Sequence, residues 1–570
     1  MNNNSLAITW YIILGFLLAT TQLSAMHRPA RISGEETTEE VQLSPSEMNE
    51  TYPLQLIPKP QRIIYSGETV PLPSYITISA GFAQEAAELL SDILSDITGV
   101  ETHLTTEETP QKGIGMAKEN NGDKNGFIRF IRDQSLTAEA YRIRTDNSGI
   151  RIYAADTNGA LWAVQTLRQL FMQIYLLSPQ EHKTMPAVVI EDAPRFAWRG
   201  FHLDLARHMF TKEYLKKTIN RLATYKINKL HLHLNDDQGW RLESEAFPLL
   251  TETGGWRTFD KYDSICIRKS ADDPTMALDK RFLRDDTLYG GYYTREDMRE
   301  IIAHAATYGM EVIPEIDMPG HMSAAIRAYP WLSCSGAAGW GEEFSHPLCT
   351  AKPEVRAFAK KVLEEVAELF PSDYLHIGAD EVETTIWEEC PLCRATMVEQ
   401  QMSGPRDLQT HFVEEMHEYL KSIGKKTVVW DDAAEEVGVS NEMYVTFWRD
   451  WKYENAAPIV ERGHPMIFAT WSHFYLSARP SFNRWKALYQ FDITEAYPGM
   501  TDDRLIGYQA CVWSEEIPGE AKLEEHIFPS IQAFSERVWS SDRDWDDFLG
   551  RMPLHYLIMD RESINYSRSR

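Results

Sequence analysis

The chain has 570 residues, and its 57 Lys and Arg against 84 Asp and Glu give a formal net charge of −27. One hydrophobic core rarely organises more than about 250–300 residues, so this length predicts at least two domains. The apolar fraction of 43% argues against a disordered chain. The acidic balance excludes nucleic acid as a partner, because binding phosphates requires clustered Lys and Arg.

The first residues predict export. An apolar run over residues 6–19 is followed by polar and small residues ending at Ala25, which is typical of a cleaved signal peptide at residues 1–25. Because the run is shorter than the ~20 residues that span a bilayer, we expect no stable membrane span. An uncleaved anchor is the alternative. Residues 26–53, rich in Glu, Thr and Ser, predict a flexible leader. We therefore expect a periplasmic, cell-surface or extracellular protein.

Residues 54–190 predict a small α+β domain. Residues 83–94 and 159–171 have the apolar spacing of helices, whereas residues 140–145 and 149–154 alternate with period two and predict a hairpin. We find no residues in this domain that suggest chemistry.

Residues 191–570 predict a (β/α)8 catalytic barrel. Helical patterns over residues 211–225, 294–308, 355–369 and 408–423 alternate with short apolar strands. The doubly wound alternative lacks a Gly-rich phosphate loop after any strand. The predicted fold is therefore α/β, a TIM-type barrel preceded by the smaller domain. The eight candidate strands are residues 200–204, 230–234, 310–316, 374–377, 427–430, 444–448, 465–469 and 508–513.

Polar and aromatic residues follow these strands, at the end of the barrel where active sites lie. Trp faces pack on the C–H faces of sugars, while carboxylates and Arg bind hydroxyl groups. The combination predicts a carbohydrate enzyme. The residues are Asp204, Arg207, Asp236, Asp237, Glu315, Asp317, His321, Asp380, Glu381, Trp430, Trp448, Trp513 and Glu515.

The adjacent carboxylates Asp380 and Glu381 are the candidate catalytic pair. Glycoside hydrolysis usually needs a protonated acid and a second carboxylate, and repulsion with partial burial would raise one pKa. Neighbouring residues of a strand point to opposite faces. Both side chains therefore reach one pocket only if the chain leaves the strand around Gly378 and Ala379.

Several motifs resemble glycoside hydrolase family 20, the β-N-acetylhexosaminidases. His376-Ile-Gly-Ala-Asp-Glu381 matches the family signature H-x-G-[GA]-D-E, and the resemblance covers about residues 54–570. It implies an exo-acting retaining enzyme that removes terminal β-linked N-acetylglucosamine or N-acetylgalactosamine from oligosaccharides or glycoconjugates, with no cofactor and no metal. Other matching segments are residues 198–207, 230–240, 312–321, 430–431 and 513–515.

The resemblance also implies roles for individual residues. Glu381 is the expected general acid/base, and Asp380 orients the 2-acetamido group of the substrate. The acetamido carbonyl is the nucleophile, which gives an oxazoline-type intermediate, and Tyr475 binds that carbonyl. The expected substrate-binding residues are Arg207 and Glu515 for hydroxyls, Trp430, Trp448 and Trp513 as aromatic walls, and Asp236 with His321 as a buried pair supporting the acid.

One position departs from the family pattern. The family usually has Tyr-x-Asp where this chain has Tyr475-Leu-Ser477. We expect an altered preference on the O4/O6 side of the sugar, such as tolerance of a 6-sulfate, with Arg479 or Arg484 as partners. Replacement by a nearby carboxylate, or a different loop alignment, is the alternative.

Two rival functions stay open, together with the gluco or galacto preference and the oligomeric state. One is a metal-dependent barrel hydrolase that uses His231, His233, His321 and Asp380. The other is a sugar-binding homologue without turnover.

The six cysteines predict no disulfide scaffold. Cys334 and Cys349 are a candidate disulfide pair. Cys390 and Cys393 form C-P-L-C, and because no second C-x-x-C or His pair accompanies it, we expect a local disulfide or two free thiols. Cys266 and Cys511 are expected to be unpaired.

Overall fold

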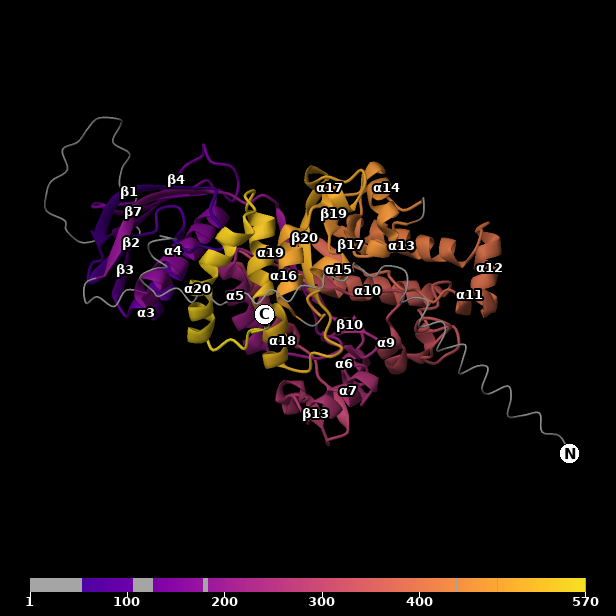
Figure 1. Ribbon diagram of the computed structural model, residues 1–570. Coiled ribbons are helices and arrows are strands. Elements are labelled where there is room, and N and C mark those ends of the chain that lie inside the picture. The colour runs from indigo at the N-terminus through magenta and orange to yellow at the C-terminus, as the bar shows by residue number, and fades with distance from the viewer. Residues whose placement is uncertain (1–53, 106–126, 178–182, 436–437, 479, 569–570) are drawn as a thin grey trace, which may run out of the picture. The chain divides into compact units, whose positions relative to one another are not determined.

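The computed structural model describes residues 54–105, 127–177 and 183–568, except residues 436–437 and 479 (Figure 1). The expected signal peptide and leader fall outside these ranges. In the described part of the chain, no helix is both long enough and apolar enough to cross a membrane.

The first described domain contains a seven-stranded sheet in the order β1-β7-β5-β6-β4-β2-β3. The predicted hairpin is present as β5 and β6, which pair Asp146 with Gly149. Both predicted helices are present and share one apolar core with the sheet. The elements are β1 (Arg62–Pro71), β2 (Tyr75–Ser79), α3 (Gln84–Thr98), β3 (Glu101–Thr105), β4 (Phe127–Arg132), β5 (Tyr141–Asp146), β6 (Gly149–Ala154), α4 (Thr157–Leu177) and β7 (Thr184–Asp192).

The second domain is a closed barrel of eight parallel strands in the order β15-β16-β17-β18-β19-β20-β8-β9. Each predicted strand is present, so the predicted fold class is confirmed. The strands are β8 (Trp198–Asp204), β9 (Lys229–His233), β15 (Glu311–Glu315), β16 (Tyr374–His376), β17 (Lys426–Trp430), β18 (Tyr444–Phe447), β19 (Met466–Phe468) and β20 (Leu505–Val512).

Helices cover the barrel, and their starts follow local sequence signals. Thr294 caps one of them, with its hydroxyl accepting from the Asp297 amide and the Asp297 carboxylate accepting from the Thr294 amide. The main helices are α5 (Lys212–Thr224), α8 (Arg295–Thr307), α10 (Pro353–Leu369), α13 (Pro405–Ser422), α14 (Ala456–Glu461), α16 (Phe482–Gln490), α18 (Glu520–Ile527), α19 (Ser530–Trp539) and α20 (Trp545–Arg561).

Long insertions follow β9, β15 and β16 at the C-terminal end of the barrel. They place short elements around the region where a site is expected. These elements are β10 (Asn235–Asp236), β11 (Gly239–Trp240), α6 (Leu249–Glu252), β12 (Trp256–Thr258), α7 (Lys261–Lys269), η1 (Pro274–Met276), η2 (Lys280–Phe282), β13 (Leu283–Arg284), β14 (Leu288–Gly290), α9 (Ser323–Ala328), η3 (Pro330–Leu332), α11 (Thr385–Glu389) and α12 (Pro391–Glu399), with η4 (Asp450–Asn455), α15 (Trp471–Phe474), α17 (Ile493–Ala496) and η5 (Asp502–Arg504) after later strands.

The cysteines differ from the expected pairing. All six are free thiols, so the predicted Cys334–Cys349 disulfide is wrong. Instead, Cys334, Cys349, Cys390 and Cys393 come together in one cluster, because the insertions after β15 and β16 meet there. Cys266 and Cys511 are unpaired, as expected.

Candidate active site

A cavity of about 250 Å³ lies among the residues that follow the barrel strands. This is slightly below the ~300–1,000 Å³ of pockets that hold drug-sized ligands, so it suits one ring-sized group. Nine of the ten residues expected to form the site line it, Trp430 being the exception. The lining residues are Arg207, Asp236, His321, Asp380, Glu381, Trp448, Trp471, Tyr475, Ser477, Trp513 and Glu515.

The chain leaves β16 in the way the catalytic pair requires. Gly378, Ala379 and Glu381 all have positive φ, at 65°, 73° and 49°. A Cβ on Gly378 would lie 1.8 Å from Oδ1 of Asp317, so only glycine fits there. The same Oδ1 accepts a hydrogen bond of 3.0 Å from the Ala379 amide. The turn brings both Asp380 and Glu381 to the cavity.

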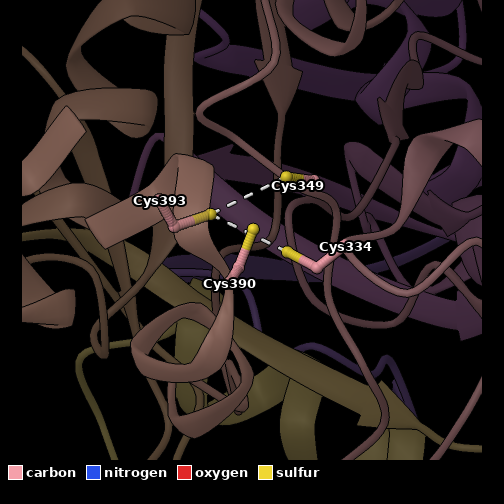
Figure 2. Close-up of side chains that lie close together, drawn as sticks. All are labelled: Cys334, Cys349, Cys390 and Cys393. Atoms are coloured by element: carbon pink, nitrogen blue, oxygen red, sulfur yellow. Dashed lines mark hydrogen bonds between the residues drawn. The ribbon is translucent and has the colours of Figure 1, made fainter. Parts of the chain in front are cut away.

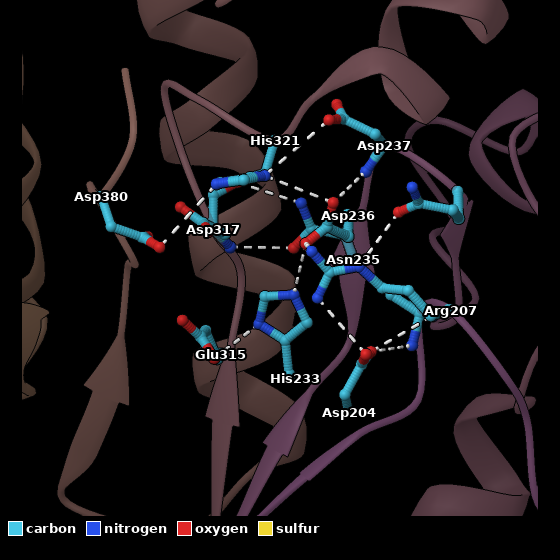
Figure 3. Close-up of polar contacts among 12 residues, drawn as sticks. Asp204, Arg207, His233, Asn235, Asp236, Asp237, Glu315, Asp317, His321 and Asp380 are labelled. Atoms are coloured by element: carbon cyan, nitrogen blue, oxygen red, sulfur yellow. Dashed lines mark hydrogen bonds and ion pairs between the residues drawn. The ribbon is translucent and has the colours of Figure 1, made fainter. Parts of the chain in front are cut away.

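His321 lies between the carboxylates of the site (Figure 3). Its Nδ1 is 3.3 Å from Asp236, and its Nε2 is 3.8 Å from Asp380. The same Nε2 is 3.6 Å from Glu381. Burial alone would lower the pKa of His321, but the Asp236 carboxylate outweighs it and holds this pKa well above its usual value. His321 is therefore an imidazolium that faces both candidate catalytic carboxyl groups.

The two candidate catalytic carboxyl groups have different surroundings. Burial, together with the neighbouring Asp317, raises the pKa of Asp380 well above its usual value. Burial also raises the pKa of Glu381, while the His321 charge opposes the rise. The Glu381 side chain stays 35% exposed. A carboxyl group with a raised pKa that still reaches the cavity is suited to donate a proton.

Arg207 is held rigidly at the other side of the cavity. Its guanidinium bonds Asp236 at 2.7 Å and Asp204 at 3.3 Å, and its Nε donates to Gln238 at 3.0 Å. Its charge also lies 5.1 Å from the ring of Trp513. Because Arg207 cannot turn away without losing these contacts, it presents a fixed donor beside the Glu515 carboxylate.

Aromatic rings form the walls of the cavity. Tyr475 stacks on Trp448 with ring centres 6.3 Å apart, and Trp513 packs against Tyr475 at 6.1 Å. The indole N–H of Trp448 donates to Asp432 at 2.8 Å, which fixes the ring. Trp471, 56% exposed, stands at the cavity edge. Sequence reasoning missed Trp471, although its position shortly after the seventh barrel strand could have indicated it.

Trp430 differs from its expected role as an aromatic wall. Its side chain is 0% exposed, it is absent from the cavity lining, and its indole N–H donates to Glu315 at 2.8 Å. It lies under the rings of Trp448, Trp513 and Tyr475, in the same apolar cluster. As the last residue of β17, it remains inside the barrel and supports the walls from beneath.

A second group of charges, which we call the Glu315 layer, lies deeper in the barrel. Four imidazoles surround the Glu315 carboxylate: His202 at 3.7 Å, His231 at 3.1 Å, His233 at 2.7 Å and His376 at 3.2 Å. Burial would raise the pKa of Glu315, but the neighbouring imidazoles, His233 first among them, hold this pKa well below its usual value. The negative charges of Glu315 and Asp236 outweigh burial and raise the pKa of His233 to about 10.

The Glu315 layer argues against the metal-dependent hydrolase that the sequence left open. That rival needs His231 and His233 to join His321 and Asp380. Instead, both histidines turn to Glu315, and burial lowers the pKa of His231 to about 3. The expected ligand set is not assembled.

Ser477 lines the cavity, whereas Arg484, one of its two expected cationic partners, does not. The Ser477 hydroxyl accepts a hydrogen bond of 2.6 Å from the Trp513 amide. Arg484 donates to the carbonyl of Tyr475 at 3.1 Å and lines a separate small cavity, so its role as a sulfate partner stays a prediction. Arg479 falls outside the described residues.

A barrel with this fold, whose mouth brings a proton-donating carboxyl group, a second buried carboxyl group and aromatic walls around one small cavity, is a glycoside hydrolase. The family model "Glycosyl hydrolase family 20, catalytic domain" matches residues 196–542, and "Glycosyl hydrolase family 20, domain 2" matches residues 53–193. The chain belongs to glycosyl hydrolase family 20, as its motifs had indicated.

Known relatives agree with this assignment. A β-hexosaminidase of Vibrio furnissii is 31% identical over 503 residues, which cover 85% of this chain and 76% of the relative. A β-hexosaminidase of Porphyromonas gingivalis is 30% identical; the match covers 90% of this chain but 64% of that longer protein. The crystal structure of an exo β-N-acetylglucosaminidase from Vibrio harveyi in complex with N-acetylglucosamine has a TM-score of 0.77 at 28% identity, covering 95% of this chain and 81% of that one.

Proposed function

We propose that this protein is an exo-acting β-N-acetylhexosaminidase that works by substrate-assisted catalysis with retention of configuration. One observation carries the proposal. Oδ1 of Asp380 is buried at the cavity, beside the acid Glu381, and has no hydrogen-bond partner among the described residues. A buried acceptor of this kind requires a donor, and the N–H of a 2-acetamido group supplies one when substrate binds.

The proposed first step uses the substrate's own nucleophile. Glu381 gives its proton to the glycosidic oxygen while the acetamido carbonyl oxygen attacks C1. The bond from C1 to the leaving oxygen breaks, and the aglycone leaves with that proton. The positive charge that develops on the acetamido group is stabilised by Asp380, which accepts its N–H, while the Tyr475 hydroxyl holds the carbonyl oxygen in attack geometry.

The second step restores the enzyme. The Glu381 carboxylate takes a proton from water, whose oxygen attacks C1 and opens the oxazoline ring. Two displacements at C1 give overall retention. Arg207 and Glu515 bind ring hydroxyls during both steps, and the names of the hexosaminidase relatives support the N-acetylhexosamine assignment.

The decisive experiment compares aryl β-N-acetylglucosaminide with aryl β-glucoside. We expect hydrolysis of the first, at least 10³-fold lower kcat/KM for the second, and the β-anomer as the first product seen by proton NMR. Comparable rates on both substrates, or the α-anomer first, would overturn the proposal. A rate in the Glu381→Gln variant equal to that of the wild type would instead favour another acid.

We further propose that Ser477 widens specificity on the O4/O6 side of the terminal sugar. Four carboxylates line the cavity, and the proposed mechanism gives each of them another role: Asp236, Asp380, Glu381 and Glu515. Among the described residues that line the cavity, the arginine is Arg207, which Asp204 and Asp236 already hold, so we propose tolerance of a 6-sulfate rather than attraction to it.

The test is the ratio of kcat/KM on 6-sulfated and plain N-acetylglucosaminides. Ser477→Asp should lower this ratio at least tenfold, because it places a negative charge against the sulfate. Ser481→Asp is the matched control, since Ser481 caps α16 away from the cavity and aspartate also caps helices. Equal ratios in all three proteins would reject the Ser477 hypothesis.

We also propose export with cleavage after residue 25, on the strength of the N-terminal sequence pattern. The N-terminal sequence of the mature protein tests this. Detection of the intact first 25 residues in the cell-associated enzyme would contradict it.

A further inference from the structure

We propose that Cys334, Cys349, Cys390 and Cys393 form a structural zinc site on the rim of the barrel. Their four sulfur atoms all lie within 4.8 Å of one another (Figure 2). The sulfur of Cys393 is 3.7 Å from that of Cys334 and 3.7 Å from that of Cys349. The site stands apart from the catalytic cavity and does not rest on the proposed function.

The spacing fits one tetrahedral ion. Zinc–thiolate bonds of about 2.3 Å place sulfur atoms about 3.8 Å apart along the edges of a tetrahedron. The two 3.7 Å distances match such edges. A disulfide would require about 2.05 Å and could join Cys393 to only one of its two equidistant neighbours. The arrangement therefore suits four ligands better than a single pair.

Local structure brings each pair of cysteines together. Ser333 and Leu348 pair as an isolated antiparallel bridge, and the Cys349 amide donates to the Leu332 carbonyl at 2.8 Å, so the two ends of the loop between η3 and α10 lie side by side. Cys334 is the residue after Ser333, and Cys349 is the residue after Leu348, so these contacts bring the two cysteines together. The C-P-L-C motif has no second pair of zinc ligands near it in the sequence. Cys334 and Cys349 supply that pair in the folded chain.

The C-P-L-C motif forms the start of a helix. Cys390 is the N-cap residue of α12, Pro391 opens the helix, and no side-chain hydrogen bond caps it. Free N–H groups and the positive end of the helix dipole lie at this terminus, and both favour thiolates over thiols. Zinc binding replaces the thiol protons, which leave to solvent, so this environment favours the metal-bound form.

The surroundings suit a closed structural site. Cys349 and Cys393 are buried and pack with Trp387, Leu408 and Val382, while Cys334 and Cys390 are partly exposed and offer an entry path. Four protein ligands leave no open position for a catalytic water. The ion would lock the insertion after β15 to the segment after β16, where Leu348 already accepts a hydrogen bond of 3.0 Å from the Trp387 indole.

The test measures metal content in the full-length chain purified without added metal or chelator. By elemental mass spectrometry we expect about one zinc ion and no stoichiometric iron per chain. After denaturation in chelator without reductant, all six cysteines should react with a thiol reagent, which shows that none is in a disulfide. Cys393→Ser should lose zinc to below a tenth of an equivalent. The control Cys266→Ser, which removes a buried thiol outside the cluster, should keep it.

Chelator should lower the Tm of the wild type and of Cys266→Ser but not that of Cys393→Ser. If Cys393→Ser does not fold, replacing zinc by Co²⁺ in the wild type should give the charge-transfer absorption of a tetrathiolate site. Disulfides among the four cysteines, stoichiometric iron, or failure of the reduced protein to take up added Zn²⁺ would each overturn the proposal.

Discussion

The barrel has two charged layers: the Glu315 layer, and above it a cavity layer formed by Asp236, His321, Asp380 and Glu381. The two layers use similar residues in opposite ways. In the Glu315 layer, one carboxylate is bonded by imidazoles and an indole, and its pKa lies far below the usual value. In the cavity layer, Asp380 keeps an unbonded oxygen, and the pKa values of Asp380 and Glu381 are both raised. Satisfied charges stabilise the fold, whereas unsatisfied ones remain available to a substrate.

The largest effect should come from removing the proton donor of the cavity layer. Glu381→Gln should lower kcat by about 10²–10⁴-fold on substrates with poor leaving groups. The loss should be smaller on aryl glycosides with acidic leaving groups, because those need less protonation. Steady-state kinetics on both substrate types checks this. Glu388→Gln in α11 is the matched control, and an equal loss on both substrates would contradict the acid role.

Breaking the Glu315 layer should instead cost stability. Glu315→Gln removes the charge that His233 and three other imidazoles face, and removing one partner of a buried pair typically costs about 3–5 kcal/mol. Glu311→Gln, at the other end of β15, removes a partly exposed partner of Lys229 and should cost less than about 1 kcal/mol. Guanidinium unfolding midpoints compare the two variants. Equal losses would show that the deeper layer has no special role.

The Glu315 layer should also make the protein less stable as the pH becomes alkaline. The pKa of His233 is raised to about 10 in the folded protein from an ordinary value of 6.5. Its stabilising charge is therefore fully present below pH 6.5 and is lost as the pH rises through 10. Between pH 7 and pH 9.5 the wild type should lose about 3 kcal/mol more than His233→Asn. Parallel curves for the two proteins would argue against a charged His233.

The sequence predicted the barrel well because strand periodicity and helix caps are local signals. Gly378 and Ala379 were identified as the point where the chain leaves its strand, since their small side chains permit the positive φ values that are found. Trp430 was misplaced because a residue that ends a strand can point into the barrel or into the cavity, and the sequence does not distinguish these. The cysteine cluster depends on two insertions meeting in space, which local spacing does not reveal.

The smallest predicted effect tests how the cavity layer is tuned. The imidazolium of His321, 3.6 Å from Glu381, opposes the burial that raises the pKa of Glu381. In the proposed mechanism protonated Glu381 is the active form, so kcat/KM should fall as the pH rises through this pKa. His321→Asn removes the positive charge and should shift that alkaline limb upward by about 1 pH unit, even as the rate falls. The control His304→Asn, on α8, should leave the limb in place. Loss of a neighbouring cation can only favour the protonated form of Glu381. A downward shift of the alkaline limb in His321→Asn would therefore mean that another group controls the limb.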